Sequence, residues 1–409
     1  KYVSQNILGM IGFSCYVLAD SYFISIAKGA DGLTALNLVM PLYSIIFSIG
    51  EMIGVGSAIR YAISKIKKDA DADDYFWNAL IWCILSSMIF VFAGIFFSAD
   101  IMRVLGADEH IVAVGNNYTK IFMCFAPMFM CNYVTNAFVR NDGAPGIAMS
   151  ATLFSSLFNI VFDYILMFPM NLGMEGAALA TALSPIIGMG ICSIHFFSKK
   201  SSVRLVVCKP SVRKLVAGCQ LGVSAFVGEM SSAVITLAFN FVILKLAGNV
   251  GVAAYGVVAN IAIVTTAVFN GVAQGSQPLI SSCFGRGDKD GCTQLKRMGY
   301  TTAFVLAAVM YSILFIFAGQ FVAVFNSEGS EMLRLYATEG VKLYFIGIFF
   351  AGINIVGGGA FSATEDAFKA AVVSVARGFV LILGAVFVMS ALFGMTGVWL
   401  AYAVAEGIT

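Results

Sequence analysis

Five ionisable residues interrupt long apolar stretches of the sequence, where a charged side chain needs a chemical reason. They are Asp20, Glu51, Asp163, Glu229 and Arg377. At bilayer depth each charge costs about 2.5 to 3.5 kcal/mol on insertion scales, so such residues mark ion pathways, proton relays or buried charge pairs. Acids outnumber the single arginine, which favours chemistry with protons or cations over chemistry with anions.

Asp20 and Asp163 are the strongest candidates for an ion or proton site. Asn159 precedes Asp163 by four residues, which places the amide and the carboxylate on one face of a helix. Two acids in one half of the chain, with Asn159 and Asn136 available to bond them, can bind a cation or exchange a proton. The alternative is that each acid bonds a neighbouring helix without a part in transport. For Glu51, Glu229 and Arg377 the sequence leaves structural and functional roles equally open.

The composition identifies the lipid bilayer as the main solvent of the elements that carry these residues. Of 409 residues, 60% are hydrophobic and 11% are charged, and the mean hydropathy is +0.91. A water-soluble surface requires far more charge. A helix crosses the hydrocarbon core with about 20 mostly apolar residues. We therefore predict an all-α membrane protein with about twelve spans, near 5–26, 33–63, 76–98, 111–139, 146–168, 176–197, 215–245, 252–284, 298–324, 335–361, 368–392 and from 396 onward.

Lysine and arginine are unequally distributed between the two sides that these spans define. The breaks after the even-numbered spans hold fifteen: Lys65, Lys67, Lys68, Arg140, Lys199, Lys200, Arg204, Lys209, Arg213, Lys214, Arg286, Lys289, Lys296, Arg297 and Lys369. The other side holds six: Lys28, Arg103, Lys120, Lys245, Arg334 and Lys342. The positive-inside rule places the richer side in the cytoplasm. We expect a multi-pass protein of the plasma membrane with a cytoplasmic N-terminus.

The chain contains an internal repeat with an offset of 219 residues, which aligns 32–69 with 251–288 without a gap. The segment 173–183 later matches 394–404 at an offset of 221. An offset of six helices makes two parallel halves, which in transporters hold a substrate site between them near the midplane. We predict an N-terminal six-helix lobe over 1–197, a cytoplasmic linker over 198–214 and a C-terminal six-helix lobe over 215–409 whose last helix is truncated. Small residues should let helices pack closely at Gly54, Gly56, Gly271 and Gly275.

Other classes of function find no support in the residues. Basic residues form no stripe interleaved with aromatics, so nucleic acid is not an expected partner. No histidine or cysteine has convincing metal-ligand spacing, and no nucleophile or acid and base pair indicates an enzyme. We expect no cofactor and no resident metal. A membrane receptor is disfavoured by the number of spans and by the duplication.

Two segments resemble signatures of the multidrug and toxin extrusion family. Leu18-Ala-Asp-Ser-Tyr-Phe-Ile-Ser25, followed by Gly29 and Ala35, is similar to the first-helix signature. Asn159-Ile-Val-Phe-Asp163, followed by the segment 173–184, is similar to the signature of the fifth and sixth helices. The repeat at Gly394 and the number of spans extend the resemblance over essentially the whole chain.

The resemblance implies a twelve-helix antiporter that expels mainly organic cations in exchange for protons or sodium ions, by alternating access and as a monomer. In this family an ion site lies in the N-terminal lobe, and its positions correspond here to Asp20, Asn159, Asp163 and Thr181, where Na⁺ could bind. Asn136 and Tyr16 correspond to nearby members of the same network. Glu229 falls at a seventh-helix acid of some members. The tenth-helix acid has no counterpart between Ala351 and Gly359, and Gln5 stands near the place of a first-helix proline.

Within the same superfamily, a lipid-linked saccharide flippase is the alternative function. Such a flippase would be expected to have a basic cavity and often fourteen spans. Arg377 is the only convincing cation that the sequence places inside the membrane. The sequence therefore favours the cation exporter, and it does not choose between H⁺ and Na⁺, because carboxylates, an amide and a hydroxyl can serve either ion.

Overall fold

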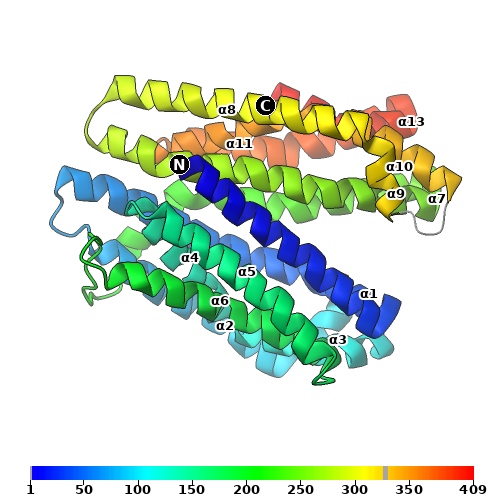
Figure 1. Ribbon diagram of the computed structural model, residues 1–409, viewed down its shortest axis with the longest axis horizontal. Coiled ribbons are helices and arrows are strands. Elements are labelled where there is room, and N and C mark those ends of the chain that lie inside the picture. The colour runs from blue at the N-terminus through cyan, green and yellow to red at the C-terminus, as the bar shows by residue number, and fades with distance from the viewer. Residues whose placement is uncertain (1, 326–329) are drawn as a thin grey trace.

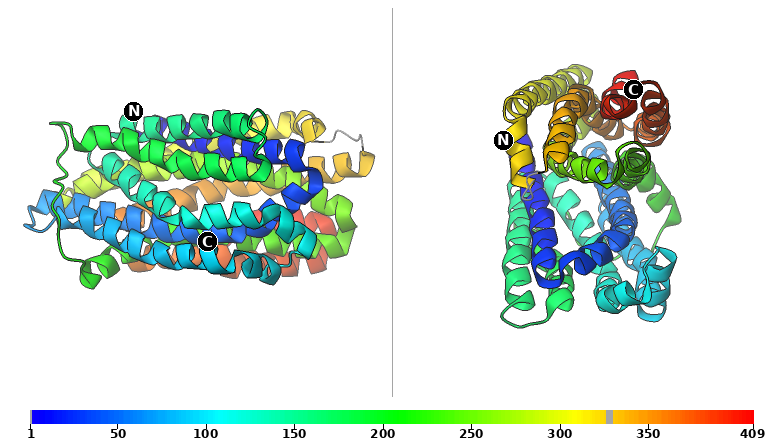
Figure 2. Two further views of the ribbon diagram at one scale, coloured as in Figure 1. Left: turned by 90° about the horizontal axis from the view of Figure 1, so that it is seen from below. Right: turned by 90° about the vertical axis from the view of Figure 1, so that its right-hand side faces the viewer.

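The computed structural model describes residues 2–325 and 330–409, and these residues form helices and connecting loops without a strand (Figure 1). The longer helices run roughly along the horizontal in the left view of Figure 2, and most are seen close to end-on in the right view. In chain order the elements are α1 (Tyr2–Lys67), α2 (Asp74–Val104), α3 (Glu109–Cys124), α4 (Ala126–Asn141), α5 (Pro145–Met167), α6 (Gly173–Phe196), α7 (Val212–Gly285), α8 (Lys289–Ile316), α9 (Ala318–Phe325), α10 (Glu331–Tyr344), η1 (Phe345–Gly347), α11 (Ile348–Ala363), α12 (Ala367–Val375), η2 (Ala376–Val380) and α13 (Leu381–Ile408).

The prediction of about twelve membrane spans is confirmed. Ten segments of the described chain are long and apolar enough to cross a bilayer, and the bent pair of α3 and α4 makes an eleventh. The last of the ten, 367–408, is interrupted at Gly394, which adopts φ 59° and ψ −136° within α13, and the helical segment that follows corresponds to the predicted twelfth span. Gly248 divides α7 in the same way, with φ 62°. A residue without a Cβ adopts this left-handed backbone without a steric penalty.

The structure corrects two of the predicted spans. The span at 111–139 consists of two helices, α3 and α4, which meet at Phe125 with a bend of 46°. Pro127 lies in the first turn of α4, where its missing N–H costs no hydrogen bond. The span predicted from 298 belongs to α8, which begins nine residues earlier at Lys289. The side chain of Asp288 caps this polar first turn by accepting from Gly291 N at 2.8 Å. A prediction based on apolar length misses such a capped polar turn.

The hydrophobic cores follow the two halves of the chain. One core is built from residues of α7 to α13 and includes Phe239, Phe345 and Trp399. Another, built mainly from α1 to α4, includes Met130 and Phe138. Figure 1 shows the helices of the first half below those of the second, with the start of α1 crossing between them. This arrangement fits the predicted pair of six-helix halves, while the exact boundaries of the lobes and linker stay a prediction.

Glycines bring helices of the two halves into backbone contact. A Cβ on Gly56 of α1 would collide with the backbone of Gly218 and Gly222 in α7. The repeat pairs Gly56 with Gly275, and a Cβ on Gly275 would lie 2.7 Å from the Cα of Val3. The predicted role of these glycines in close helix packing is therefore confirmed. The Gly56 contact lies near the end of α1 and the start of α7, and the Gly275 contact lies near the start of α1 and the end of α7. The two halves therefore touch at the end of the bundle that carries the basic loops.

Ion pairs strengthen the contact at the same end. Glu365, which follows α11, pairs with Arg60 and with Lys67 of α1, the latter at 3.4 Å. Arg60 also donates to the backbone oxygen of Ala217 in α7 at 3.4 Å. In this conformation the bundle is therefore closed at the end that carries the basic loops.

Candidate functional site

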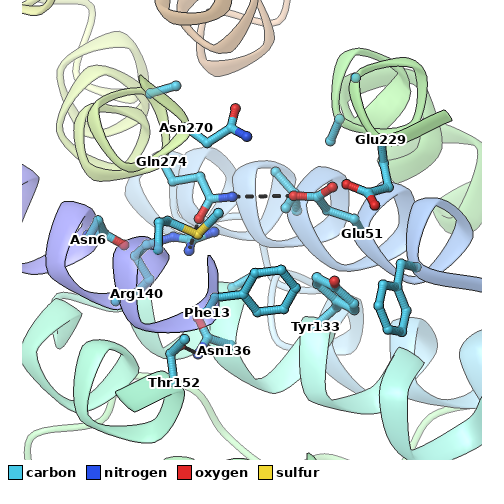
Figure 3. A pocket seen from close by; sticks show the side chains of 18 of the residues that line it. Asn6, Phe13, Glu51, Tyr133, Asn136, Arg140, Thr152, Glu229, Asn270 and Gln274 are labelled. Carbon is cyan, nitrogen blue, oxygen red and sulfur yellow. Dashed lines mark hydrogen bonds between the residues drawn. The ribbon is translucent and has the colours of Figure 1, made fainter. Parts of the chain in front are cut away.

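A central cavity lies between the two halves, and both halves contribute polar side chains to it (Figure 3). From the first half α1, α4, α5 and α6 line it, and from the second half α7, α11, α12 and η2 do so. The repeat aligns Glu51 of α1 with Asn270 of α7, and both face the cavity. The wall in the first half includes five aromatic side chains: Phe13, Tyr16, Phe47, Phe129 and Tyr133.

The structure brings together five of the six predicted ion-site residues. With its amide oriented by its neighbours, Asn159 donates from Nδ2 to Asp163 Oδ2 at 3.1 Å. Its amide oxygen accepts from the hydroxyl and the backbone N–H of Thr181, each at 3.2 Å. Asp20 of α1 interacts electrostatically with Asp163, and Tyr16 interacts with both acids. The i, i+4 spacing in α5 thus places amide and carboxylate on one face, as the sequence predicts.

The two carboxylates are deeply buried and incompletely bonded. Asp163 is 0% and Asp20 is 6% exposed. The Oδ1 atom of each has no hydrogen-bond partner among the described residues. Asn159, Thr181 and Tyr16 line the cavity, whereas neither aspartate is part of its wall. Because an incompletely bonded carboxylate is costly to bury, this cluster can accept a proton or a small cation that arrives from the cavity.

Asn136 lies outside this cluster, although the sequence offered it as a bonding partner for the acids. Its amide donates to the backbone oxygen of Ala148 and to the hydroxyl of Thr152, both at 3.2 Å. Figure 3 shows this pair at the cavity wall formed by α4 and α5. In this conformation Asn136 holds α4 against α5 rather than completing the carboxylate site.

Arg140 corrects the sequence analysis, which counted it among the cytoplasmic loop cations. It is 5% exposed, lines the cavity from α4, and donates from Nη1 to Gln274 Oε1 of α7 at 2.7 Å. Gln274 in turn donates from Nε2 to Glu51 Oε1 at 3.3 Å (Figure 3). Gln274 was missed because a glutamine in an apolar run gives no charge signal. This amide connects a cation and an acid of the first half to the second half.

Glu229 points toward Glu51 from the opposite wall, on α7 (Figure 3). Their carboxylates interact electrostatically. Within the described chain no hydrogen bond or ion pair satisfies Glu229. The cavity therefore contains two acids and two arginines, counting Arg377, and not the mostly acidic set that the sequence predicted.

Arg377 forms a buried ion pair that the sequence analysis did not anticipate. Its Nη2 donates to Glu406 Oε1 at 2.6 Å, and Asn354 Nδ2 donates to Glu406 Oε2 at 2.8 Å. Arg377 lies in the π-helical turn η2, and Glu406 lies near the end of α13. The signal that could have found Glu406 is a lone acid in the final apolar run, opposite the one arginine of the span before it.

Comparison with known proteins agrees with this architecture. A model of the MatE family matches residues 6–165 and 225–390. Over 405 residues the chain is 28% identical to the multidrug export protein MepA of Staphylococcus aureus (strain MRSA252), covering 96% of this chain and 87% of that protein. It is 26% identical over 396 residues to MepA of Staphylococcus saprophyticus subsp. saprophyticus, with the same coverage.

A solved structure has the same fold. It is the outward-facing conformation of a multidrug resistance MATE family transporter of the MOP superfamily, with a TM-score of 0.92 and 20% sequence identity. The alignment covers 100% of this chain and 92% of that one. Because the family model matches well over half of the residues, the chain belongs to the MatE family and is a membrane transporter rather than an enzyme.

Proposed function

We propose that the protein is a secondary active antiporter that exports organic cations in exchange for H⁺ or Na⁺. The observation that carries the proposal is the pair of buried aspartates behind a cavity that both halves line, since one oxygen of each has no hydrogen-bond partner among the residues that the structure describes. In this proposal Asp20 and Asp163 bind the coupling ion, and the oxygens of Asn159 and Thr181 serve as neutral ligands. Tyr16 lines the cavity and interacts with both acids.

Coupling follows from the electrostatics of one cavity. An ion on the aspartates and a cationic drug in the cavity each reduce the benefit of binding the other, which is the negative coupling that exchange requires. The contacts of Gly56 and Gly275 and the pair of Arg60 with Glu365 close one end of the bundle. Breaking them while the other end closes would give alternating access. If the basic loops are cytoplasmic, the present conformation opens outward.

The energy of one charge is sufficient for useful export. Moving one elementary charge through about 100 mV releases about 2.3 kcal/mol. Since about 1.4 kcal/mol corresponds to a tenfold ratio, that energy supports a drug gradient of about fortyfold. Exchange of one net charge per drug molecule would therefore suffice.

Bulky, partly apolar cations are the substrates that the cavity wall fits best. Phe13, Phe47, Phe129 and Tyr133 present aromatic rings to the cavity. Contact of a cation with such rings adds about 0.5 to 2 kcal/mol without fixing one geometry. The relatives from Staphylococcus are named multidrug export proteins, which supports export over the alternative of a lipid-linked saccharide flippase.

The test is transport by the purified protein in proteoliposomes. Tetraphenylphosphonium serves as a bulky monocation, and an imposed proton or sodium gradient supplies the energy. We expect uphill movement of the cation with one of the two gradients and none in protein-free vesicles. Transport of anionic lipid-linked sugars, without movement of the cation under either gradient, would contradict the proposal.

The orientation in the plasma membrane is tested separately. The segment from the end of α6 through the first turn of α7 carries six basic residues, Lys199, Lys200, Arg204, Lys209, Arg213 and Lys214, and we place it in the cytoplasm. Single cysteines engineered within 201–212, in a background without the native cysteines, should react with an impermeant maleimide only after the cells are opened. Labelling of intact cells would reverse the proposed topology and place the N-terminus outside.

A further inference from the structure

Arg140 is a cation whose hydrogen-bonding capacity is largely unused. A guanidinium offers five N–H donors. Among the described residues only its Nη1 group has an acceptor, the amide oxygen of Gln274. The Nε atom is buried and has no hydrogen-bond partner within the described part of the chain. Because the side chain lines the cavity, the remaining N–H donors of its two Nη groups can bond to a ligand that enters it.

Glu51, the acid nearest in charge interaction to Arg140, makes no direct hydrogen bond with it among the described residues. Gln274 lies between the guanidinium and Glu51, so that the two charges interact only across a neutral amide. Glu229 lies beyond Glu51 on the opposite side of the view in Figure 3. The cavity thus has a positive end at Arg140 and a negative end at the two glutamates. The other arginine of the wall, Arg377, is already satisfied by Glu406.

We propose that Arg140 forms an anion-accepting subsite, so that the cavity prefers substrates that carry a carboxylate or a comparable acceptor in addition to their cationic group. The cationic group lies toward Glu229 and Glu51, and the acceptor receives hydrogen bonds from the guanidinium. A planar fork of N–H groups matches a carboxylate in geometry as well as in charge. This inference rests on the proposed export of organic cations and adds a second requirement to the substrate.

Rhodamine B and its ethyl ester provide a matched pair of probes. Both are bulky aromatic cations, and they differ in that the first carries a carboxylate where the second carries an uncharged ester. Binding is measured by fluorescence polarisation on the purified full chain in detergent. The variants are Arg140→Gln, which removes the charge, and Arg140→Lys, which keeps it. Arg297→Gln, on the exposed face of α8, is the control.

Loss of a charge-assisted hydrogen bond weakens binding by about tenfold or more. We expect Arg140→Gln to lose at least this much affinity for rhodamine B while its affinity for the ester stays the same or rises. Arg140→Lys should recover part of the lost affinity, and Arg297→Gln should bind both dyes like the parent protein. Equal effects of Arg140→Gln on both dyes, or no effect on either, would refute the subsite while leaving cation export intact. If the parent protein binds neither dye and does not move tetraphenylphosphonium, the proposed function itself fails.

Discussion

Each half of the molecule buries a cluster of charged residues beside the same cavity, and the two clusters are bonded differently. In the second half both oxygens of Glu406 accept hydrogen bonds, from Arg377 and from Asn354. In the first half Asp20 and Asp163 interact with each other, and one oxygen of each has no hydrogen-bond partner in residues 2–325 and 330–409. Burial is similar, since Glu406 is 5% and Asp20 is 6% exposed.

The difference indicates which cluster can work as an ion site. A buried acid that is paired with an arginine has its charge compensated and needs no further ligand. Two neighbouring acids without a cation repel each other when both are ionised, and binding of a proton or a metal ion relieves this repulsion. We therefore infer that the second-half cluster fixes η2 against the end of α13, whereas the first-half cluster binds and releases the coupling ion.

The largest effect is expected from breaking the paired cluster. Glu406→Gln leaves the Arg377 guanidinium buried without a counter-charge, which costs about 3 to 5 kcal/mol. The variant should therefore show a much lower thermal midpoint in detergent and little folded protein in the membrane. Size-exclusion profiles after graded heating measure the change.

Replacing both partners separates charge from packing. Arg377→Met combined with Glu406→Leu removes both charges, so the double variant should recover most of the stability that Glu406→Gln loses. If Glu406→Gln is as stable as the parent protein, the ion pair is not structural, and the contrast between the two clusters loses its basis.

Asp20→Asn should have a smaller effect on folding and a complete effect on coupling. The amide preserves the shape of the side chain and removes the charge that would bind the ion. We expect normal amounts of folded protein, with the gradient-driven accumulation of about fortyfold reduced to none. Uptake of tetraphenylphosphonium into proteoliposomes, at matched protein amounts, measures this. Asp290→Asn on α8, which replaces an exposed acid, is the control. Active accumulation by the Asp20 variant would move the ion site elsewhere.

Thr181→Ala should have the smallest effect of the three. The hydroxyl that donates to Asn159 is lost, and with it a neutral ligand in the proposed ion site. A single hydrogen bond contributes about 0.5 to 1.5 kcal/mol, so the ion concentration for half-maximal transport should rise about fivefold. Transport measured over a series of sodium concentrations or pH values gives this quantity. Thr181→Ser keeps the hydroxyl and should stay close to the parent value; an equal shift in both variants would indicate altered packing.

Much of the architecture and part of the candidate site could be predicted from the sequence. Apolar length predicts the spans because each transmembrane helix must satisfy its own backbone hydrogen bonds in lipid. The i, i+4 spacing predicts that Asn159 and Asp163 share a face because helix geometry is local. The boundary between α3 and α4 and the start of α8 were harder to place. The first depends on the position of a proline and the second on side-chain capping, and hydropathy reports neither.

The sequence by itself determined that the chain is a membrane protein, that it contains an internal duplication, and that Asp20 and Asp163 are candidate ion-binding acids within apolar segments. The tertiary structure alone decided which charges have partners. Arg140 resembles a loop cation along the chain and lies in the cavity, while Glu406 lies 29 residues from Arg377 and pairs with it. The physical reason is that hydropathy reports each segment's preference for lipid. Charge compensation depends on distances between atoms of different helices, and these distances arise only when the two halves pack together.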